Sequence, residues 1–325
     1  MRNRHLLVGD IGGTNARFAL ANEDHPGFHD VVELKCADFE TSGDAIRHYL
    51  GAVGVRSLDA VCLAAAGPVI NGDIDVTNNH WDLKVAELSS AFDVDAIRLL
   101  NDFEGVAYSL PFIGAEDREL IGPDRGEKLE GRDFTIAVLG PGTGLGIAGL
   151  SCRAGHCRPI SGEGGHVGFA PETNEQVELL KVMRTRFERV SRERLVAGSG
   201  IENIFSALLE MRGEEGVLTA PEVFAAAGNP GPAADAVRLF FEILGQIAGD
   251  LVLTVGGFDG AYIAGGIAKR YPEVLANGAF RAGFESKGRY REILEGVPTY
   301  LITHEQPGLL GASYVAQNLV APGRN

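Results

Sequence analysis

The stretch from Leu6 to Leu20 constrains the fold most, because one apolar run enters a glycine-rich turn and a second apolar run leaves it. Gly12 and Gly13 can adopt positive φ and let backbone N–H groups approach an oxyanion, and Thr14 adds a side-chain donor. Asp10 would repel a bare phosphate, so it favours a divalent cation, held directly or through water. The segment predicts a phosphate-binding β-hairpin. An ordinary turn between two core strands is the alternative that these residues leave open.

The chemical balance of the chain limits its partners. Its 325 residues exceed one average domain, so two lobes with a cleft between them are expected, and 45% hydrophobic residues are enough for a sizeable core. The formal net charge of −15 argues against nucleic acid and against an anionic membrane surface. Asp10 interrupts the first apolar run too early for a signal peptide, so we expect a cytoplasmic protein.

The four cysteines show no Cys-x-x-Cys spacing; they are Cys36, Cys62, Cys152 and Cys157. This spacing indicates neither a disulfide scaffold nor a zinc ribbon. His166 follows Glu163 in a loop and could form half of a metal site, but no second His or Cys cluster is suitably placed. We therefore expect no zinc.

Hydrophobic periodicity predicts alternating strands and helices. The apolar runs expected as strands are residues 5–8, 16–21, 60–66 and 96–100. The patterns expected as helices are residues 42–50, 104–110, 233–253 and 311–319, with a helical stretch over 176–211 interrupted at 197–200. We place the lobe boundary in the turn-rich segment 111–132. The last helix can fold back on the first lobe, which gives a small lobe of residues 1–112 plus 305–325 and a large lobe of residues 113–304.

A second glycine-rich hairpin repeats the layout of the first. Residues 134–150 form an apolar run, a turn containing Gly142, Thr143 and Gly144, and another apolar run. Repetition of such a hairpin in two lobes carries more weight than either hairpin alone. A third turn, at Gly265 and Gly266, joins a strand to a helix, where a paired glycine could let a flat ring lie on the backbone. Close packing at a helix entry is the alternative for this pair.

Other phosphate-binding signatures are missing from the sequence. No Gly-Lys dipeptide occurs, which argues against a P-loop NTPase, and no His-Arg-Asp catalytic loop of a protein kinase is present. The glycines of residues 140–146 alternate, and a strand rather than a helix follows them, so a dinucleotide-binding Rossmann fold is only a weak alternative.

The ordered set of motifs resembles the bacterial glucokinase family. The segments that carry the resemblance span most of the chain: Gly9-Asp10-Ile11-Gly12-Gly13-Thr14-Asn15, Leu100-Asn101-Asp102-Phe103, Gly140 to Gly146, Ser161-Gly162-Glu163-Gly164-Gly165-His166 and Ala264-Gly265-Gly266-Ile267. The resemblance implies an α/β, two-lobed actin-like ATPase (ribonuclease H-like) fold with an interlobe cleft. It also implies ATP and Mg²⁺ as cofactors, glucose as substrate and a homodimer.

Phosphorylation of a sugar requires a group that accepts the hydroxyl proton. Asp102 is the candidate, because it follows an apolar strand where a carboxylate would face a cleft. Asp102 could instead cap the helix that follows it. In the resembled family, the matching aspartate is the base and the residue matching Asn101 binds the sugar.

Further sugar contacts follow from the resemblance. The family's sugar-binding residues match Glu163, His166 and Glu193, and Asn78 could line the cleft. Glu193 stands in an arginine-rich segment, so pairing with arginines on a solvated helix face is its alternative. Trp81 is expected to pack in the core.

The nucleotide is expected between the two hairpins, with adenosine near the third turn and Mg²⁺ placed by Asp10, through water. The residues concerned are Gly9, Asp10, Ile11, Gly12, Gly13, Thr14, Gly142, Thr143, Gly144, Gly265 and Gly266. Three alternatives remain: a kinase of another hexose or with another phosphoryl donor, a sugar-responsive repressor, and an actin-like ATPase. The repressor would need a DNA-binding extension before the first strand, and the ATPase would have no use for Asp102 together with Glu163 and His166.

Overall fold

The computed structural model describes residues 4–124, 129 and 131–321, and its chain divides into two compact units. The first comprises Met1–Gly114, His156–Ser161 and His304–Asn325, and the second comprises Ala115–Gly155 and Gly162–Thr303. The strand His156–Ser161 thus groups with the first unit, whereas the sequence had placed it in the large lobe. In the turn-rich segment where we expected the boundary, residues 125–128 and 130 lie outside the described part of the chain.

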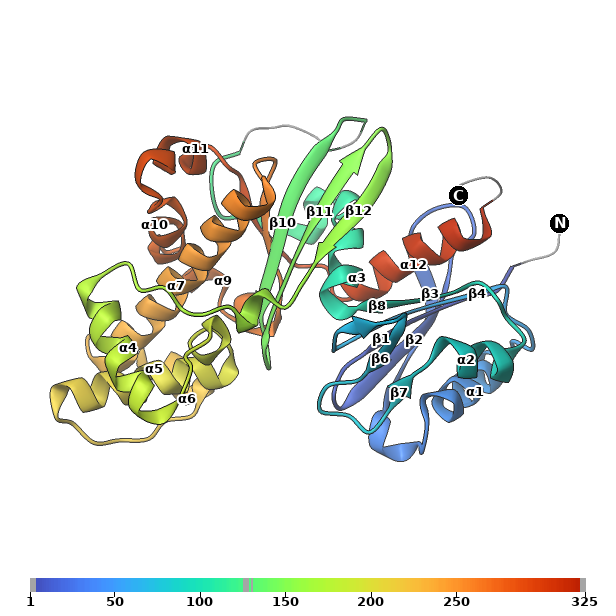
Figure 1. The fold of residues 1–325 in the computed structure, drawn as a ribbon, viewed down its shortest axis with the longest axis horizontal. Coiled ribbons are helices and arrows are strands. Elements are labelled where there is room, and N and C mark those ends of the chain that lie inside the picture. The colour runs from blue at the N-terminus through green and yellow to red at the C-terminus, as the bar shows by residue number, and fades with distance from the viewer. Residues whose placement is uncertain (1–3, 125–128, 130, 322–325) are drawn as a thin grey trace. The chain divides into compact units, whose positions relative to one another are not determined.

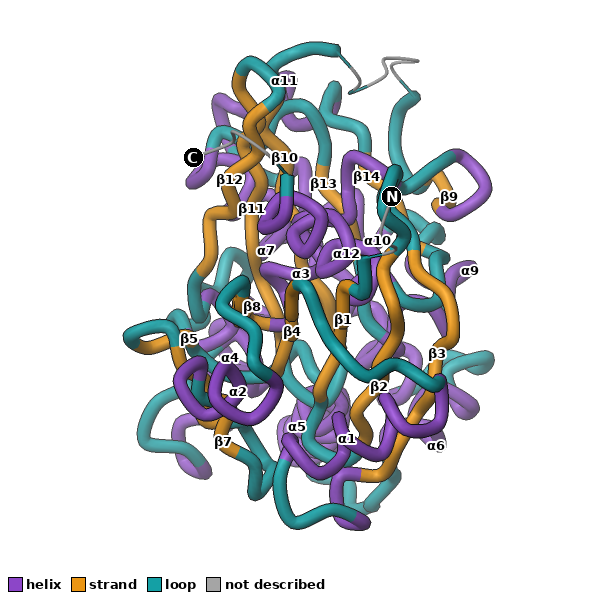
Figure 2. The backbone as a smooth tube through the Cα atoms, turned by 90° about the vertical axis from the view of Figure 1, so that its right-hand side faces the viewer, coloured by secondary structure: helices purple, strands orange, loops and turns teal. Residues whose placement is uncertain are grey.

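The first unit is built on a mixed sheet with the strand order β3-β2-β1-β4-β8 (Figures 1 and 2). Its strands are β1 (Leu6–Ile11), β2 (Asn15–Ala21), β3 (Phe28–Lys35), β4 (Ala60–Ala65) and β8 (Ile97–Asn101). A small antiparallel sheet accompanies it, formed by β5 (Val69–Ile70), β6 (Asp73–Asp75) and β7 (Asp82–Leu83). All six residues of β4 are buried, as expected for a parallel strand covered on both faces.

Helices cover both faces of this sheet; they are α1 (Ser42–Val53), α2 (Val85–Phe92), α3 (Asp102–Ser109) and α12 (Pro307–Val320). The alternation of side chains along β1 explains the arrangement. Leu7 belongs to the core cluster that contains Ile46 of α1, whereas Val8 belongs to the cluster that contains Leu309 of α12. The expectation that the last helix folds back on the first lobe is confirmed.

Helices α3 and α12 pack closely because glycines face each other at their contact. A Cβ atom on Gly311 would meet the carbonyl oxygen of Gly105 at 1.8 Å, which is far inside van der Waals distance. A Cβ atom on Gly105 would in turn lie 3.0 Å from the Cβ of Ala64 on β4. The close approach of these helices therefore depends on residues without side chains.

A second mixed sheet has the order β12-β11-β10-β13-β14-β9, and all its strands except β12 belong to the second unit. Its strands are β9 (Arg118–Leu120), β10 (Phe134–Pro141), β11 (Leu145–Arg153), β12 (His156–Ser161), β13 (Ala261–Ile263) and β14 (Thr299–Ile302). The helices are α4 (Asn174–Arg186), α5 (Gly198–Arg212), α6 (Ala220–Ala226), α7 (Pro232–Val255), α8 (Gly266–Arg270), α9 (Pro272–Leu275), α10 (Ala279–Glu285) and α11 (Arg291–Glu295). The fold is α/β with two mixed sheets, as expected.

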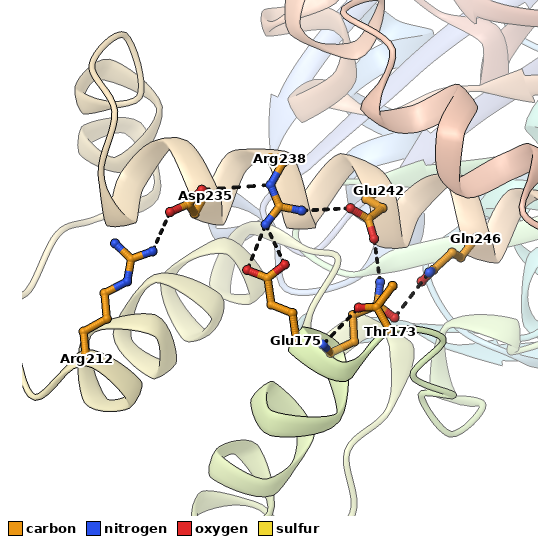
Figure 3. A network of polar contacts seen from close by, with 8 residues as sticks. Thr173, Glu175, Arg212, Asp235, Arg238, Glu242 and Gln246 are labelled. Carbon is orange, nitrogen blue, oxygen red and sulfur yellow. Dashed lines mark hydrogen bonds and ion pairs between the residues drawn. The ribbon is translucent and has the colours of Figure 1, made fainter.

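One polar stripe of α7 holds α4 and α5 (Figure 3). Arg238 donates two hydrogen bonds to the carboxylate of Glu175 on α4, at 2.8 and 2.7 Å, and one to Glu242, at 2.9 Å. One turn earlier on α7, Asp235 forms an ion pair with Arg212 of α5. Leu239 and Phe240 of the same helix are fully buried, so α7 has one apolar and one charged face.

Two predictions from the sequence need correction. The break in the helical stretch 176–211 lies between α4 and α5, and Gly198 begins α5. A Cβ atom on Gly200 would lie 2.4 Å from the carbonyl carbon of Leu195, so a glycine is needed in the first turn of α5. Cys152 and Cys157 are disulfide-bonded, although their spacing did not indicate it. They flank a two-residue turn, Ala154 and Gly155, in which both residues have positive φ, and this places them level on neighbouring strands.

The burial of Trp81 and the length of the apolar helices bear on two further expectations. Trp81 is buried, with 1% of its surface exposed, and its Nε1 donates a hydrogen bond to the carbonyl of Phe39, so its expected packing role is confirmed. Among the described residues, no helix is both long and apolar enough to cross a lipid bilayer.

The α3–α12 contact gives a stability prediction. Gly311→Ala should destabilise the protein by about 1–3 kcal/mol, because its methyl group overlaps a backbone carbonyl that cannot rotate away. Gly51→Ala is the matched control: Gly51 lies in α1 with nothing within 4 Å of its Cβ position, so alanine there should stabilise by about 0.5–1 kcal/mol. Urea denaturation followed by circular dichroism measures both. An unchanged midpoint for Gly311→Ala would contradict the close contact.

Candidate functional site

The first unit gathers three strand ends at one edge of its sheet. In the parallel ladder, Ile11 of β1 is level with Ala65 of β4, and Ala65 is level with Asn101 of β8. The turns that follow these strands therefore emerge side by side, in the place where ligands collect in α/β proteins. The first hairpin, the segment around Gly67, and Asp102 lie along this edge.

Asp10 is the half-buried carboxylate of the first hairpin. A Cβ atom on Gly308 would lie 3.1 Å from Cγ of Asp10, so the carboxyl group packs on the first turn of α12. Burial raises the pKa of Asp10, and Arg17, which faces it from β2, lowers that pKa by a smaller amount. A cation beside Asp10 would favour its ionised form.

The structure gives a different reason from the expected one for the presence of glycine in the first hairpin. Neither Gly12 nor Gly13 has a positive φ, so the expected left-handed conformation is wrong. A Cβ atom on Gly13 would instead lie 3.1 Å from the backbone oxygen of Asn78 and 3.3 Å from its Cβ. Gly13 is thus required for close approach, and the turn that carries Asn78 lies directly on the hairpin. Asn78 is exposed and lines a hollow of about 610 Å³ on the first unit, beside Pro68.

The end of β8 is held by a helix cap. Oδ1 of Asn101 accepts a hydrogen bond from the N–H of Phe103 at 2.9 Å, and Nδ2 donates to the carbonyl of Gly67 at 3.0 Å. The N-cap role that the sequence left open for Asp102 belongs to Asn101. Asp102 is the first residue of α3, is half-buried, and its Oδ1 also accepts from Phe103 at 2.9 Å. A carboxylate is stable there because the helix N-terminus carries partial positive charge.

The second hairpin is tied to two helix starts within the second unit. The N–H of Gly198, at the beginning of α5, donates to the carbonyl of Gly142 at 2.9 Å, and Gly142 donates to Gly144 at 2.8 Å. Gly265 has φ of +89° and a Cβ atom there would lie 2.4 Å from the carbonyl oxygen of Pro141. Gly265 is therefore explained by close packing, whereas Gly266 has open space around its Cβ position.

Three expected sugar-binding residues surround the start of β11. Oε2 of Glu193 accepts a hydrogen bond from the N–H of Leu145 at 2.9 Å. Glu163 precedes a short 3₁₀ turn, η4 (Gly164–His166), which ends in His166 and packs on the same strand. A Cβ atom on Gly165, inside this turn, would lie 2.2 Å from the carbonyl oxygen of Leu145. The structure thus brings all three together within the second unit.

The alternative environment for Glu193 is wrong. Its segment is not a solvated helix face, because Glu193 lies in a 3₁₀ turn, η5 (Arg192–Arg194), between α4 and α5. The neighbouring Arg192 pairs with Asp250, at 3.2 Å, and its backbone N–H donates to Val167. Glu193 is half-buried against the hairpin, and a Cβ atom on Gly144 would lie 2.5 Å from its Oε2.

The sequence reasoning missed some residues of the site. Asn79 donates a hydrogen bond to the carbonyl of Gly12, and Gly67, with φ of +140°, presents its carbonyl to Asn101. Gly308 leaves the space that Asp10 occupies. The adjacent asparagines Asn78 and Asn79 were the only visible signal, because the other contacts join segments distant in the sequence.

A family model described as Glucokinase matches residues 7–319. The glucokinase of Hahella chejuensis is 37% identical over 318 residues, covering 97% of this chain and 98% of that protein. The glucokinase of a Caulobacter species is 41% identical over 312 residues, with 94% and 93% covered. The chain belongs to the glucokinase family.

Solved glucokinase structures resemble this chain over nearly its whole length. The glucokinase of an Antarctic psychrotroph has a TM-score of 0.87 at 32% identity, covering 98% of this chain and 100% of that one. The glucokinase of Balamuthia mandrillaris, solved in complex with glucose, has a TM-score of 0.79 at 28% identity, covering 97% and 94%. The actin-like ATPase fold that the motifs implied for this glucokinase-family chain is confirmed.

Asp10 gives a prediction on stability and pH. At pH 7–8, Asp10→Asn should raise the thermal unfolding midpoint, because an amide avoids the cost of an ionised carboxylate in a buried place. The gain should shrink as the pH falls through the raised pKa, since Asp10 is then protonated and neutral. Scanning calorimetry from pH 4 to 8 measures this, with exposed Asp95→Asn as control. A lower midpoint for Asp10→Asn at pH 8 would contradict the burial cost.

The paired glycines of the third turn give a second prediction. Gly265→Ala should destabilise the protein by about 1–3 kcal/mol, since its φ is positive and Pro141 blocks the methyl group. Gly266→Ala should fold with nearly unchanged stability. A loss of nucleotide affinity in Gly266→Ala at normal stability would then report a ligand contact. Equal affinity for wild type and Gly266→Ala would place the adenine elsewhere.

Proposed function

We propose that this chain transfers the γ-phosphoryl group of ATP to the 6-hydroxyl of D-glucose, giving glucose 6-phosphate and ADP. The observation that carries the proposal is Asp102, a half-buried carboxylate at the first turn of α3, in a chain that matches the glucokinase family from residue 7 to residue 319. A carboxylate in that position can take the hydroxyl proton as the bond to phosphorus forms.

The proposed sugar contacts are considered unit by unit. Asn78 and Asn101 contact the sugar from the first unit, and the second unit contributes Glu163, His166 and Glu193. Asn101 uses one amide hydrogen on Gly67 and one lone pair on Phe103, so a second hydrogen and a second lone pair remain for a hydroxyl. The carboxylates of Glu163 and Glu193 suit neighbouring hydroxyl pairs, which donate to them.

The proposed phosphate contacts come from the glycine-rich hairpin of each unit. The first hairpin supplies Gly9, Asp10, Ile11, Gly12, Gly13 and Thr14, and the second supplies Gly142, Thr143 and Gly144. In this proposal the N–H of Gly13 stabilises negative charge on a phosphoryl oxygen, because the N–H groups of Gly12 and Gly142 already donate within their own turns. Adenosine rests near Gly265 and Gly266, where Gly266 leaves open space.

Asp10 fits a magnesium ion. Mg²⁺ usually keeps several waters and takes one or two carboxylates together with phosphate oxygens. A carboxylate beside a turn suited to phosphate matches that donor set, and a bound cation would offset the burial that raises the pKa of Asp10. Among the described residues no cluster of three or more His, Cys, Asp or Glu side chains could hold a metal ion. When bound, Mg²⁺ neutralises charge on the phosphates.

Two features of the proposal extend beyond the site itself. The family resemblance implies a homodimer, which sedimentation equilibrium tests.

Glucose differs from mannose and glucosamine by one substituent or configuration, so a hexose panel crossed with ATP, ADP and polyphosphate tests both the sugar and the donor.

Replacement of the proposed base tests the function directly. Asp102→Asn keeps Oδ1 as an acceptor for the N–H of Phe103, so the start of α3 is retained. We expect kcat to fall by about 10²- to 10⁴-fold, the usual contribution of a general base, with nucleotide affinity nearly unchanged. A coupled assay for ADP, with and without glucose, gives the rates. Exposed Asp95→Asn serves as control.

The same assay separates the alternatives. Near-normal turnover of Asp102→Asn would remove Asp102 as the base. ADP formation by the wild type that is independent of any sugar would favour an ATPase instead.

A further inference from the structure

One peptide of the first hairpin is held by side chains from two other segments. The carbonyl of Gly12 accepts a hydrogen bond from Nδ2 of Asn79 at 3.0 Å. The thiol of Cys36, in the turn after β3, approaches the same oxygen at 3.8 Å. The N–H of Gly12 donates to the carbonyl of Asn15 at 2.9 Å, so both polar groups of this residue are engaged.

The side chain of Asn79 is itself fixed. Its Oδ1 accepts from the backbone N–H groups of His80, at 2.7 Å, and Trp81, at 3.2 Å. Because Oδ1 faces two donors and Nδ2 faces a carbonyl, the orientation of the amide follows from its partners. Trp81 is buried, which anchors the turn formed by residues 76–81.

This contact matters because the peptide that it holds joins two glycines. Glycine tolerates both orientations of its peptide, so the Gly12–Gly13 bond has little intrinsic preference. In a trans peptide the carbonyl oxygen and the following N–H point to opposite sides. Holding the oxygen of Gly12 toward Asn79 therefore fixes the N–H of Gly13 on the side away from the turn of residues 76–81. A flipped peptide would replace that donor with a carbonyl dipole, which repels phosphate.

We propose that Asn79 is a positioning residue that locks the Gly12–Gly13 peptide in the orientation that presents the N–H of Gly13 to a phosphate of the nucleotide. This rests on the proposed function, which places the nucleotide at the first hairpin. The turn that carries Asn79 also carries Asn78, a proposed sugar contact whose backbone oxygen lies against Gly13. The hydrogen bond from Asn79 to Gly12 therefore connects the turn that carries the proposed sugar contact with the peptide proposed to bind phosphate.

Two substitutions at Asn79 separate positioning from simple support of the turn. Asn79→Asp keeps an oxygen that can accept from His80 and Trp81, but it places a carboxylate oxygen against the carbonyl of Gly12, where the two repel. Asn79→Ala removes both sets of bonds. His80→Ala is the matched control for support of the turn, because it removes the contact of Nε2 of His80 with the carbonyl of Phe39 but keeps the backbone N–H that donates to Asn79.

Isothermal calorimetry with a non-hydrolysable ATP analogue and Mg²⁺ measures the effect, together with kcat, KM for ATP and glucose, and the unfolding midpoint. We expect nucleotide Kd to rise about five- to tenfold in Asn79→Ala, the equivalent of one hydrogen bond, and at least as much in Asn79→Asp. KM for glucose should change less than KM for ATP, and His80→Ala should keep the nucleotide affinity of the wild type even if its unfolding midpoint falls.

Wild-type nucleotide affinity in Asn79→Asp would overturn the proposal, since a carboxylate that supports the turn would then suffice. A lowered unfolding midpoint in Asn79→Ala with unchanged Kd and kinetics would overturn it as well. The proposed function fails separately, if the wild-type chain forms no ADP in response to glucose. The Kd comparison still decides the role of Asn79 in that case.

Discussion

The in-register parallel pairing of β1, β4 and β8 is the constraint on which the first unit depends. It brings the turns after Ile11, Ala65 and Asn101 to one edge, so the hairpin proposed to bind phosphate and the proposed base Asp102 follow neighbouring strand ends. Helices α3 and α12 then start at this edge and pack on each other through glycines, which fixes Asp102 at one helix start and Asp10 against the other. Packing and chemistry are therefore set by the same contacts.

Some residues of the candidate site have an unfavourable burial or backbone freedom that packing alone does not explain. Burial raises the pKa of Asp10, which disfavours its ionised form, and the proposed cation would favour that form. The glycine pair of the first hairpin lacks a conformational preference, and Asn79 supplies it from another segment. In the second unit Glu193 holds the hairpin through Leu145, so a residue proposed for the sugar also supports the phosphate turn. Residues at functional sites often lower the stability of the fold in this way.

The sequence predicts local patterns well and distant contacts poorly. Both hairpins, the long helix α7 and the returning helix α12 follow from apolar periodicity and glycine-rich turns, and Asp102 follows from its place after a strand. The contact of Asn79 with Gly12 joins residues 67 positions apart, and no local pattern encodes it. Asn101, not Asp102, caps α3. The sequence left this open, because it does not show which of two adjacent polar residues has helical dihedral angles. The roles of the site residues stay predictions until they are measured.

The central claim is that a carboxylate at the end of β8 directs the phosphoryl group of ATP to a sugar hydroxyl rather than to water. Identification of the product by ³¹P and ¹³C NMR, after incubation of the purified chain with ATP, Mg²⁺ and ¹³C-labelled glucose, tests it most directly. The account predicts one phosphorus coupled to carbon 6 of glucose for each ADP formed. Inorganic phosphate in place of a sugar phosphate, or phosphate attached at another carbon, would contradict it.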